Sequence, residues 1–254
     1  MSVTIKSLIR RLFYRSQLFR VAVGCISILI RRTQSIGISH LLSYVNKNAL
    51  GPLQRDEAIA LFGIVKTLCP KTIVEFGFFH GHSAFNFLCA LEPDARLYSY
   101  DISLDSAMRA KEELSFDHRL TFIHKSQADF NPSDIDHRPI DFVFFDAAHD
   151  LALNIETFKR IVHCLAPGAI IAIHDTGLWQ KSHFSHAQTR VVETAAHGRW
   201  ITNNLYAHQP QERAFVNWIV SHQSHFGAVH FHSINTLRHG FSLLQLQLSL
   251  PNAA

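Results

Sequence analysis

From residue 51 onward, short apolar runs alternate with longer amphipathic segments, and this alternation restricts the folds that the chain can adopt. The apolar runs have the length and composition of buried strands and lie at 72–76, 96–100, 120–124, 141–145 and 169–173. Before and between them, segments with helical spacing lie at 55–68, 83–91, 106–114 and 155–165. Strands that alternate with helices in this way predict a parallel sheet covered by helices on both faces.

The end of the chain departs from this pattern. Two strand-like runs, 229–233 and 240–248, follow each other with only a short connection between them, which favours an antiparallel pair at the edge of the sheet. The expected fold class is therefore α/β, a Rossmann-like doubly wound sheet of seven strands whose last strand is antiparallel.

The first 50 residues differ in charge from the rest. They contain eight Lys or Arg and no Asp or Glu, whereas the remaining chain holds 16 basic and 20 acidic residues. Apolar residues at helical spacing predict a basic amphipathic helix near the N-terminus. The apolar run 21–30 is too short to span a bilayer, which needs about 20 residues. We therefore expect two domains: a basic, apolar helical extension (1–50) and an α/β domain (51–254).

Three roles for residues 1–50 stay open at this stage. The segment can pack on the α/β domain, contact an anionic membrane surface peripherally, or act as a transit peptide. Four widely spaced cysteines without a CxxC pair support neither a disulfide framework nor a zinc ribbon. A reducing, cytoplasmic location is the expectation.

The turn after the first predicted strand contains candidate binding residues. Glu75, Gly77, Gly81 and Ser83 follow the strand in the pattern E-x-G-x-x-x-G-x-S. Glycines allow a tight turn and close approach of a ligand to the backbone, and the N-terminus of the next helix suits a carboxylate. The spacing is not G-x-G-x-x-G, so the dinucleotide fingerprint is absent. A purely structural turn that binds no ligand could have the same sequence pattern.

Other strand ends also carry polar residues, and ligands bind at the carboxyl ends of strands in such sheets. Asp101 ends the second strand and can accept the hydroxyls of a ribose. Asp146 and Asp175 follow the fourth and fifth strands and can hold a hard divalent cation. His149 can serve as a general base near neutral pH. The structural alternatives are that the aspartates cap helices and that His149 is an ordinary loop residue. The chain has 18 histidines, so one can lie near a strand end by coincidence.

Together these motifs resemble class I S-adenosylmethionine-dependent methyltransferases. More narrowly, they are similar to the group that includes macrolide-sugar O-methyltransferases and cephalosporin-hydroxylase-like proteins. The resemblance covers about residues 51–248 and rests on the 75–83 turn, Asp101, Asp146-x-x-His149, the Pro-Gly before Ile-His-Asp-Thr (173–176) and Thr-Leu-Arg-His-Gly (236–240).

The resemblance implies a role for each matching residue. Glu75, Gly77 and Gly81 would lie beneath the methionine moiety of S-adenosylmethionine, whose carboxylate Ser83 would bind. Asp101 would hold the ribose, and Ser126 and Gln127 would flank the adenine. Asp146 would lie beside the sulfonium and bind a metal together with His174 and Asp175, and His149 would be the base. The chain departs from the group in having Asp-Ala-Ala-His at 146–149 and a histidine at 174, which favours Mn²⁺ over Mg²⁺ if a metal is bound.

The sequence thus predicts an S-adenosylmethionine-dependent O-methyltransferase that methylates a hydroxyl of a sugar, glycan or small metabolite. The first alternative is a catalytically inactive cofactor-binding or scaffold protein. A nucleotide-dependent oxidoreductase is disfavoured by the glycine spacing, and specific nucleic-acid binding by the acidic body of the chain. The sequence is also compatible with a homo-oligomer.

Overall fold

The computed structural model describes residues 18, 39–42, 53–115, 117–147, 149–176, 190–194, 198–202, 209–223, 226–232 and 240–246. The chain divides into two compact units, Met1–His40 and Leu41–Ala254. Of the first unit only Leu18, Ser39 and His40 are described, so the predicted basic helix and the apolar run lie outside the described residues. The boundary expected at residue 50 also lies outside them and stays a prediction.

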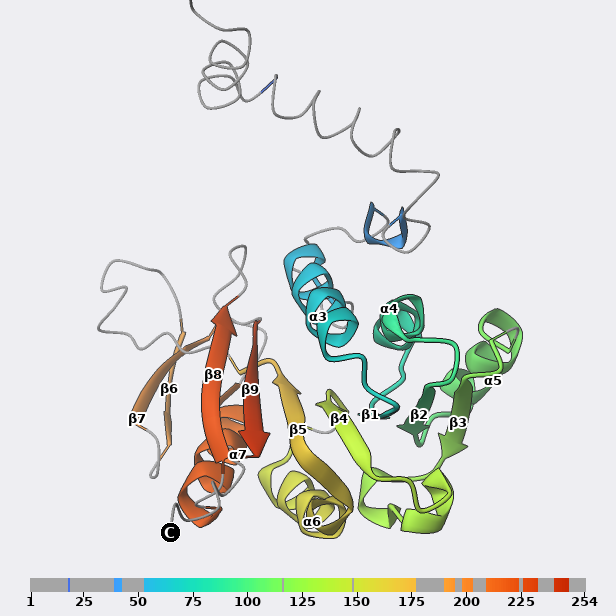
Figure 1. Cartoon of the computed structure of the whole chain (residues 1–254). Helices are drawn as coiled ribbons and strands as arrows, with labels where there is room; N and C mark the ends of the chain where they lie inside the picture. The colour runs from blue at the N-terminus through green and yellow to red at the C-terminus, as the bar shows by residue number, and fades with distance from the viewer. Residues whose placement is uncertain are drawn as a thin grey trace, which may run out of the picture. The chain divides into compact units, whose positions relative to one another are not determined.

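The second unit is built on one seven-stranded sheet (Figure 1). Its strands follow the order β3-β2-β1-β4-β5-β9-β8. All neighbours from β3 to β5 are parallel, and β9 is antiparallel to both β5 and β8. This confirms the predicted fold, including the antiparallel last strand. The strands are β1 (Thr72–Phe76), β2 (Arg96–Asp101), β3 (Leu120–His124), β4 (Ile140–Phe145), β5 (Leu165–His174), β8 (Phe226–His232) and β9 (Gly240–Leu246).

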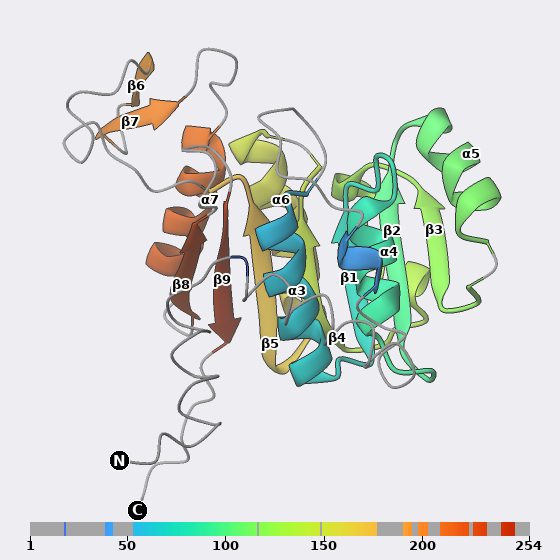
Figure 2. The ribbon, with the colours of Figure 1, turned by 90° about the horizontal axis from the view of Figure 1, so that it is seen from above.

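Helices cover both faces of the sheet, which explains why its central strands are apolar on both sides. One face packs against α3 (Arg55–Leu68), α4 (His82–Ala90) and α5 (Leu104–Glu113), of which α3 and α4 lie side by side (Figure 2). The other face packs against α6 (Leu151–Ile161) and α7 (Gln209–His222). Strand β4 shows the alternation directly, because Phe142 and Phe144 face the first layer whereas Val143 and Phe145 face the second.

Local caps explain where the helices begin earlier than predicted. The Asp150 carboxylate accepts a hydrogen bond from the Leu153 backbone N–H at 2.8 Å, so α6 begins at Leu151 rather than at residue 155. Ser103 caps α5 in the same way. Short 3₁₀ turns complete the connections: η1 (Ser39–Leu42), η2 (Gln127–Asp129), η3 (Pro132–Ile135) and η4 (Val162–Cys164).

Two features between β5 and β8 were not predicted. Strands β6 (Arg190–Thr194) and β7 (Gly198–Thr202) form a separate antiparallel pair, and helix α7 follows them. Among the described residues, no helix combines the length and the apolarity that crossing a bilayer requires.

Candidate active site

The strand order reverses between β1 and β4, and the backbone there is packed too closely for any side chain at position 77. The Asp146 backbone N–H donates to the Phe76 carbonyl at 2.8 Å, which holds the ends of the two strands together. Gly77 has a φ of +103°, and a Cβ built on it would lie 2.4 Å from the Asp146 carbonyl oxygen. The glycine therefore lets the turn after β1 pass directly against the end of β4, at the switch point where ligands bind in such sheets.

The next residues of this turn open the helix α4. Gly81 precedes the helix with a φ of +73°, a left-handed conformation that glycine adopts without strain. Ser83 lies in the first turn of α4 and is buried. The free N–H groups of that first turn and the positive end of the helix dipole favour a negatively charged group in front of them.

Glu75 is a completely buried carboxylate in β1. Its Oε2 accepts a hydrogen bond from the Ser99 hydroxyl of the neighbouring strand β2. Burial raises the pKa of Glu75 to about 7, although hydrogen bonds from Ser83 and Ser99 act in the opposite direction. Burial in β1 thus favours the neutral form of this carboxyl group.

The burial of Glu75 has a measurable consequence for stability. Because the folded state binds the Glu75 proton more tightly than the unfolded state, this group favours folding most at low pH, and stability falls as the pH rises from 4.5 through 7. We expect Glu75→Gln to remove this loss, so that the variant gains about 2–3 kcal/mol relative to wild type between pH 5 and pH 8. Urea unfolding of both proteins at the two pH values measures the gain, and parallel pH profiles would contradict the assignment.

Asp101 ties two loops together at the end of β2. One carboxylate oxygen accepts from the Phe79 backbone N–H and the other from the Ser103 N–H, each at 2.8 Å. These bonds connect the turn after β1 to the start of α5. Each carboxylate oxygen has a second lone pair, and the side chain is only partly buried, so Asp101 keeps the capacity to accept hydrogen bonds from a ligand.

Ser126 and Gln127 follow β3. The Ser126 hydroxyl accepts from the Ala128 N–H and begins the short turn η2. Gln127 is buried, and its amide nitrogen donates to Asn154 Oδ1 on α6 at 2.8 Å. Its oxygen Oε1 is also buried and has no hydrogen-bond partner among the described residues. An unsatisfied buried acceptor of this kind can receive a hydrogen bond from a ligand.

The three predicted metal-binding residues lie together. Asp146, His174 and Asp175 each offer a ligand atom, and these atoms lie within 4.8 Å of one another. His174 Nδ1 is 2.9 Å from Asp146 Oδ1. Asp175 is buried and adopts a left-handed backbone conformation with φ of +56°, which is uncommon for a residue with a side chain and typical of functional sites. Sequence and structure thus bring the same three residues to the ends of β4 and β5.

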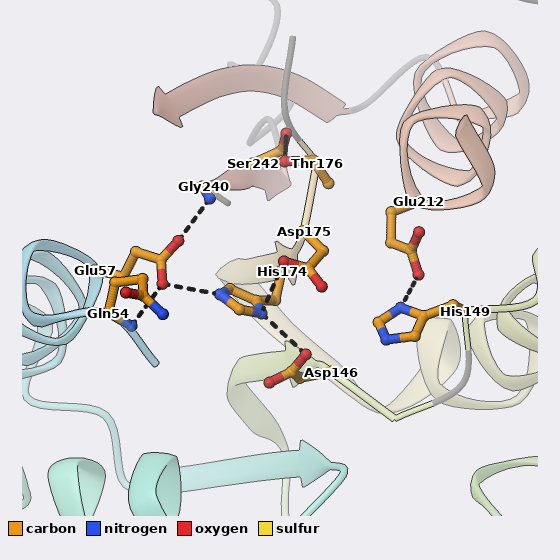
Figure 3. A network of polar contacts seen from close by, with 10 residues as sticks. All are labelled: Gln54, Glu57, Asp146, His149, His174, Asp175, Thr176, Glu212, Gly240 and Ser242. Atoms are coloured by element: carbon orange, nitrogen blue, oxygen red, sulfur yellow. Dashed lines mark hydrogen bonds and ion pairs between the residues drawn. The ribbon is translucent and has the colours of Figure 1, made fainter. Parts of the chain in front are cut away.

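The opposite nitrogen of His174 contacts a residue that the sequence analysis did not select. Glu57 of α3 is fully buried, and its Oε2 lies 3.2 Å from His174 Nε2 (Figure 3). The same carboxylate accepts from the backbone N–H groups of Gln54 at 2.9 Å and Gly240 at 2.6 Å. Glu57 therefore joins helix α3 to the end of β5 and the start of β9, and the ring of His174 lies between two carboxylates.

These carboxylates determine the charge of His174. Burial alone would lower the pKa of His174, but the surrounding carboxylates outweigh it, Asp146 most strongly, and raise that pKa well above its usual value. Without another cation in the cluster, His174 is thus the positive charge that balances part of the surrounding negative charge.

His149 lies on the loop between β4 and α6 and contacts a second residue that the sequence analysis missed. Its Nδ1 is hydrogen-bonded to Glu212 Oε1 on α7 (Figure 3). Burial lowers the pKa of His149, but the hydrogen bond with Glu212 and its charge exceed that effect, and the net pKa is raised. Burial in turn raises the pKa of Glu212 to about 7. The hydrogen bond with His149 and its charge oppose this rise, because both favour the ionised carboxylate.

Comparison with known proteins shows which domain family and which fold this chain is similar to. Residues 74–176 match a family model described as a methyltransferase domain, and the match spans the strand ends described above. A caffeoyl-CoA O-methyltransferase candidate of Arabidopsis thaliana is 28% identical over 128 residues, which cover 49% of this chain and 54% of the relative. The chain spans little more than half the length of the curated relatives that it matches.

Solved structures of similar fold include O-methyltransferases. The enzyme from Bacillus cereus, solved in complex with SAH, is 16% identical and superposes with a TM-score of 0.59, covering 78% of this chain and 84% of that one. TomG from Streptomyces achromogenes, solved with SAM, is 17% identical with a TM-score of 0.58, covering 88% and 96%. At these identities the likeness establishes the Rossmann-like methyltransferase fold.

Proposed function

We propose that this protein is an S-adenosylmethionine-dependent O-methyltransferase that acts on a hydroxyl of a small molecule. The observation that carries the proposal is the position of the strand ends: the glycine turn, the acid at the end of β2 and the cluster after β4 and β5 all lie within or at the edge of the matched methyltransferase domain. Two proteins of the same fold, solved with SAH and with SAM, support the choice of cofactor.

The cofactor would lie along the carboxyl ends of β1 to β4. In this proposal Glu75, Gly77 and Gly81 form the turn beneath the methionine moiety, and the start of α4 with Ser83 binds its carboxylate. Asp101 accepts the ribose hydroxyls. The buried acceptor of Gln127 receives the adenine amino group, and Ser126 lies beside it.

The reaction would be an in-line displacement beside Asp146. The hydroxyl oxygen of the acceptor attacks the methyl carbon, the carbon–sulfur bond breaks, and the electron pair returns to sulfur. Binding both reactants in line supplies much of the rate enhancement. His149 takes the hydroxyl proton as the general base.

The cluster at Asp146 also fits a divalent cation. Asp146 and Asp175 supply oxygens and His174 supplies a nitrogen, a mixed donor set that suits Mn²⁺ better than Mg²⁺. A histidine that binds a metal through one ring nitrogen is usually hydrogen-bonded to a carboxylate through the other. Glu57 occupies that position at Nε2 of His174. A bound cation would act as a Lewis acid on the acceptor oxygen.

Metal binding can be tested without an acceptor. We expect wild-type protein to bind Mn²⁺ saturably, measured by loss of the free-ion signal in electron paramagnetic resonance, and Asp175→Asn to bind it at least about 10-fold more weakly because one of its ligands is lost. Asp105→Asn, an exposed acid on α5, is the matched control. Activity that survives chelation, together with no saturable Mn²⁺ binding, would remove the cation from the proposal.

The acceptor is the molecule whose hydroxyl would receive the methyl group. We expect a small molecule and propose a sugar, glycan or metabolite hydroxyl. Transfer of labelled methyl from S-adenosylmethionine to a panel of catechols, sugars and polyhydroxylated metabolites tests this, with product detected by mass spectrometry. Cofactor binding without transfer to any member of the panel would favour the alternative of a cofactor-binding or scaffold protein.

The N-terminal segment is a separate question. We propose that residues 1–50 form a domain of their own that contacts anionic membrane surfaces peripherally through its eight basic residues. Sedimentation with vesicles that contain phosphatidylserine tests this: equal binding by the full chain and by a chain lacking residues 1–50 would reject it.

A further inference from the structure

Helix α7 carries two adjacent charged side chains that are both buried. Glu212 and Arg213 are 3% and 2% exposed. Charged residues are rarely buried this deeply unless each has a specific partner. Figure 3 shows Glu212 directed from α7 toward His149 on the loop after β4.

Arg213 fixes the start of this helix to the site. Its Nη2 donates to the Thr176 carbonyl at 2.7 Å and lies 3.4 Å from the Ser242 hydroxyl of β9. The Ser242 hydroxyl donates in turn to Thr176 Oγ1 at 2.7 Å. Thr176 directly follows Asp175, so these bonds hold α7 in register with the end of β5.

The apolar side of α7 provides a second attachment. Phe215 packs edge-on against Phe145 of β4, with ring centroids 5.2 Å apart, and against Phe158 of α6 at 6.2 Å. Both partners belong to the elements that flank the His149 loop. The position of the Glu212 carboxylate is therefore determined by the same core that positions His149.

The contact between Glu212 and His149 determines which ring nitrogen carries the proton. When Glu212 is ionised, its carboxylate only accepts hydrogen bonds, and Nδ1 of His149 is then the donor. In the neutral ring the lone pair then lies on Nε2. His149 is 31% exposed, whereas Glu212 is covered, so the ring is the member of this pair that an acceptor can reach.

We propose that Glu212 is the positioning residue of His149, holding its ring in the tautomer that is protonated at Nδ1 and unprotonated at Nε2. The inference rests on the proposed methyl transfer. In that reaction the acceptor O–H proton passes to Nε2, the oxygen forms a bond to the methyl carbon, and the bond to sulfur breaks with its electron pair left on the neutral thioether. Glu212 stabilises the resulting imidazolium and takes up no atom itself.

The second oxygen of Glu212 argues against a role in stability alone. Oε2 is buried and has no hydrogen-bond partner among the described residues. Burial of a carboxylate with an unfilled oxygen destabilises the folded state, and a neutral side chain of similar size would avoid this cost. Glu212 therefore lowers the stability of the fold, while its other oxygen is hydrogen-bonded to His149.

The tautomer of His149 can be measured directly. We expect ¹H–¹⁵N long-range spectra of histidine-labelled wild-type protein to show neutral His149 protonated at Nδ1, with its signals assigned by comparison with His149→Gln. The negative charges of Glu212, Asp175 and Asp146 all raise the pKa of His149. Glu212→Gln should therefore lower this pKa, because the charge that contacts the ring is lost. Glu212→Ala should also remove the tautomer preference.

Kinetics with the best acceptor of the panel give the second readout. Glu212→Gln should lower kcat about 10–100-fold, shift the acid limb of the pH profile to lower pH, and leave the Kd for S-adenosylmethionine unchanged. Glu212→Asp should recover part of the rate. Glu156→Gln, an exposed acid on α6 paired with Arg160, is the control and should match wild type.

Two results would overturn the proposal. One is a wild-type His149 whose neutral ring is protonated at Nε2, a result that needs no variant to fold. The other is a folded Glu212→Gln protein with the wild-type kcat and pH profile. If no acceptor is methylated, the proposed function fails while the spectra still decide whether Glu212 controls the ring.

Discussion

Replacing His149 with alanine is expected to lower kcat by about 10²–10⁴-fold, the usual contribution of a positioned general base. The ring lies beyond Asp146 on the loop after β4 and does not belong to the turn that would hold the cofactor. The Kd for S-adenosylmethionine should therefore stay at the wild-type value. Initial rates with the best acceptor and calorimetric titration with the cofactor measure the two quantities on the same protein.

A matched control shows whether a loss of rate is specific to His149 or follows from replacing any histidine by alanine. His163 is exposed on η4, and His163→Ala should keep both rate and affinity. Wild-type turnover by His149→Ala would assign proton removal to another group. An equal loss of rate and cofactor affinity would place His149 in the cofactor site instead.

The sheet was predictable from the sequence, and the residues proposed to bind the cofactor could be selected from it, because the signals of both are local. Strand β4 is apolar at almost every position, which is typical of a central parallel strand. The glycines at 77 and 81 mark a turn through their spacing, and the structure shows the physical reason, since both adopt positive φ. Asp101 could be selected in the same way because it directly ends a strand.

The residues that support the two histidines could not be predicted in this way. Glu57 lies 117 residues from His174 and looks in the sequence like an ordinary acid in the first turn of a helix. Glu212 lies 63 residues from His149 on a helix that was not predicted at all. Both contacts arise only when separate helices dock on opposite faces of the sheet. The local feature that could have drawn attention to Glu212 is its place in a Glu-Arg pair directly before the apolar run Ala214–Val216.

The two missed acids also explain how two histidines are held at this edge of the sheet. His174 lies between Glu57 and Asp146, and His149 contacts Glu212. Each histidine is thus paired with a carboxylate on another element, which fixes its ring and raises its pKa. Both histidines of the site are therefore held by carboxylates that lie far from them in the sequence.

The second large effect concerns the cofactor itself. Asp101 would accept the two ribose hydroxyls, and each hydrogen bond to a charged group contributes about 1.5–3 kcal/mol. We expect Asp101→Ala to weaken S-adenosylmethionine binding about 100-fold or more. Because Asp101 also accepts from the Phe79 and Ser103 N–H groups, thermal unfolding must accompany the titration to show that the variant is folded. Asp105→Asn serves as the control on the neighbouring helix.

Calorimetric titration of the wild-type chain and Asp101→Ala with S-adenosylmethionine is the most direct test of the methyl-donor site. The predicted result is saturable binding of one cofactor per wild-type chain and at least a 100-fold higher Kd for the folded variant. Wild-type protein that shows no saturable binding at millimolar cofactor, or a folded variant that binds as tightly as wild type, would contradict the site at the ends of β1 and β2.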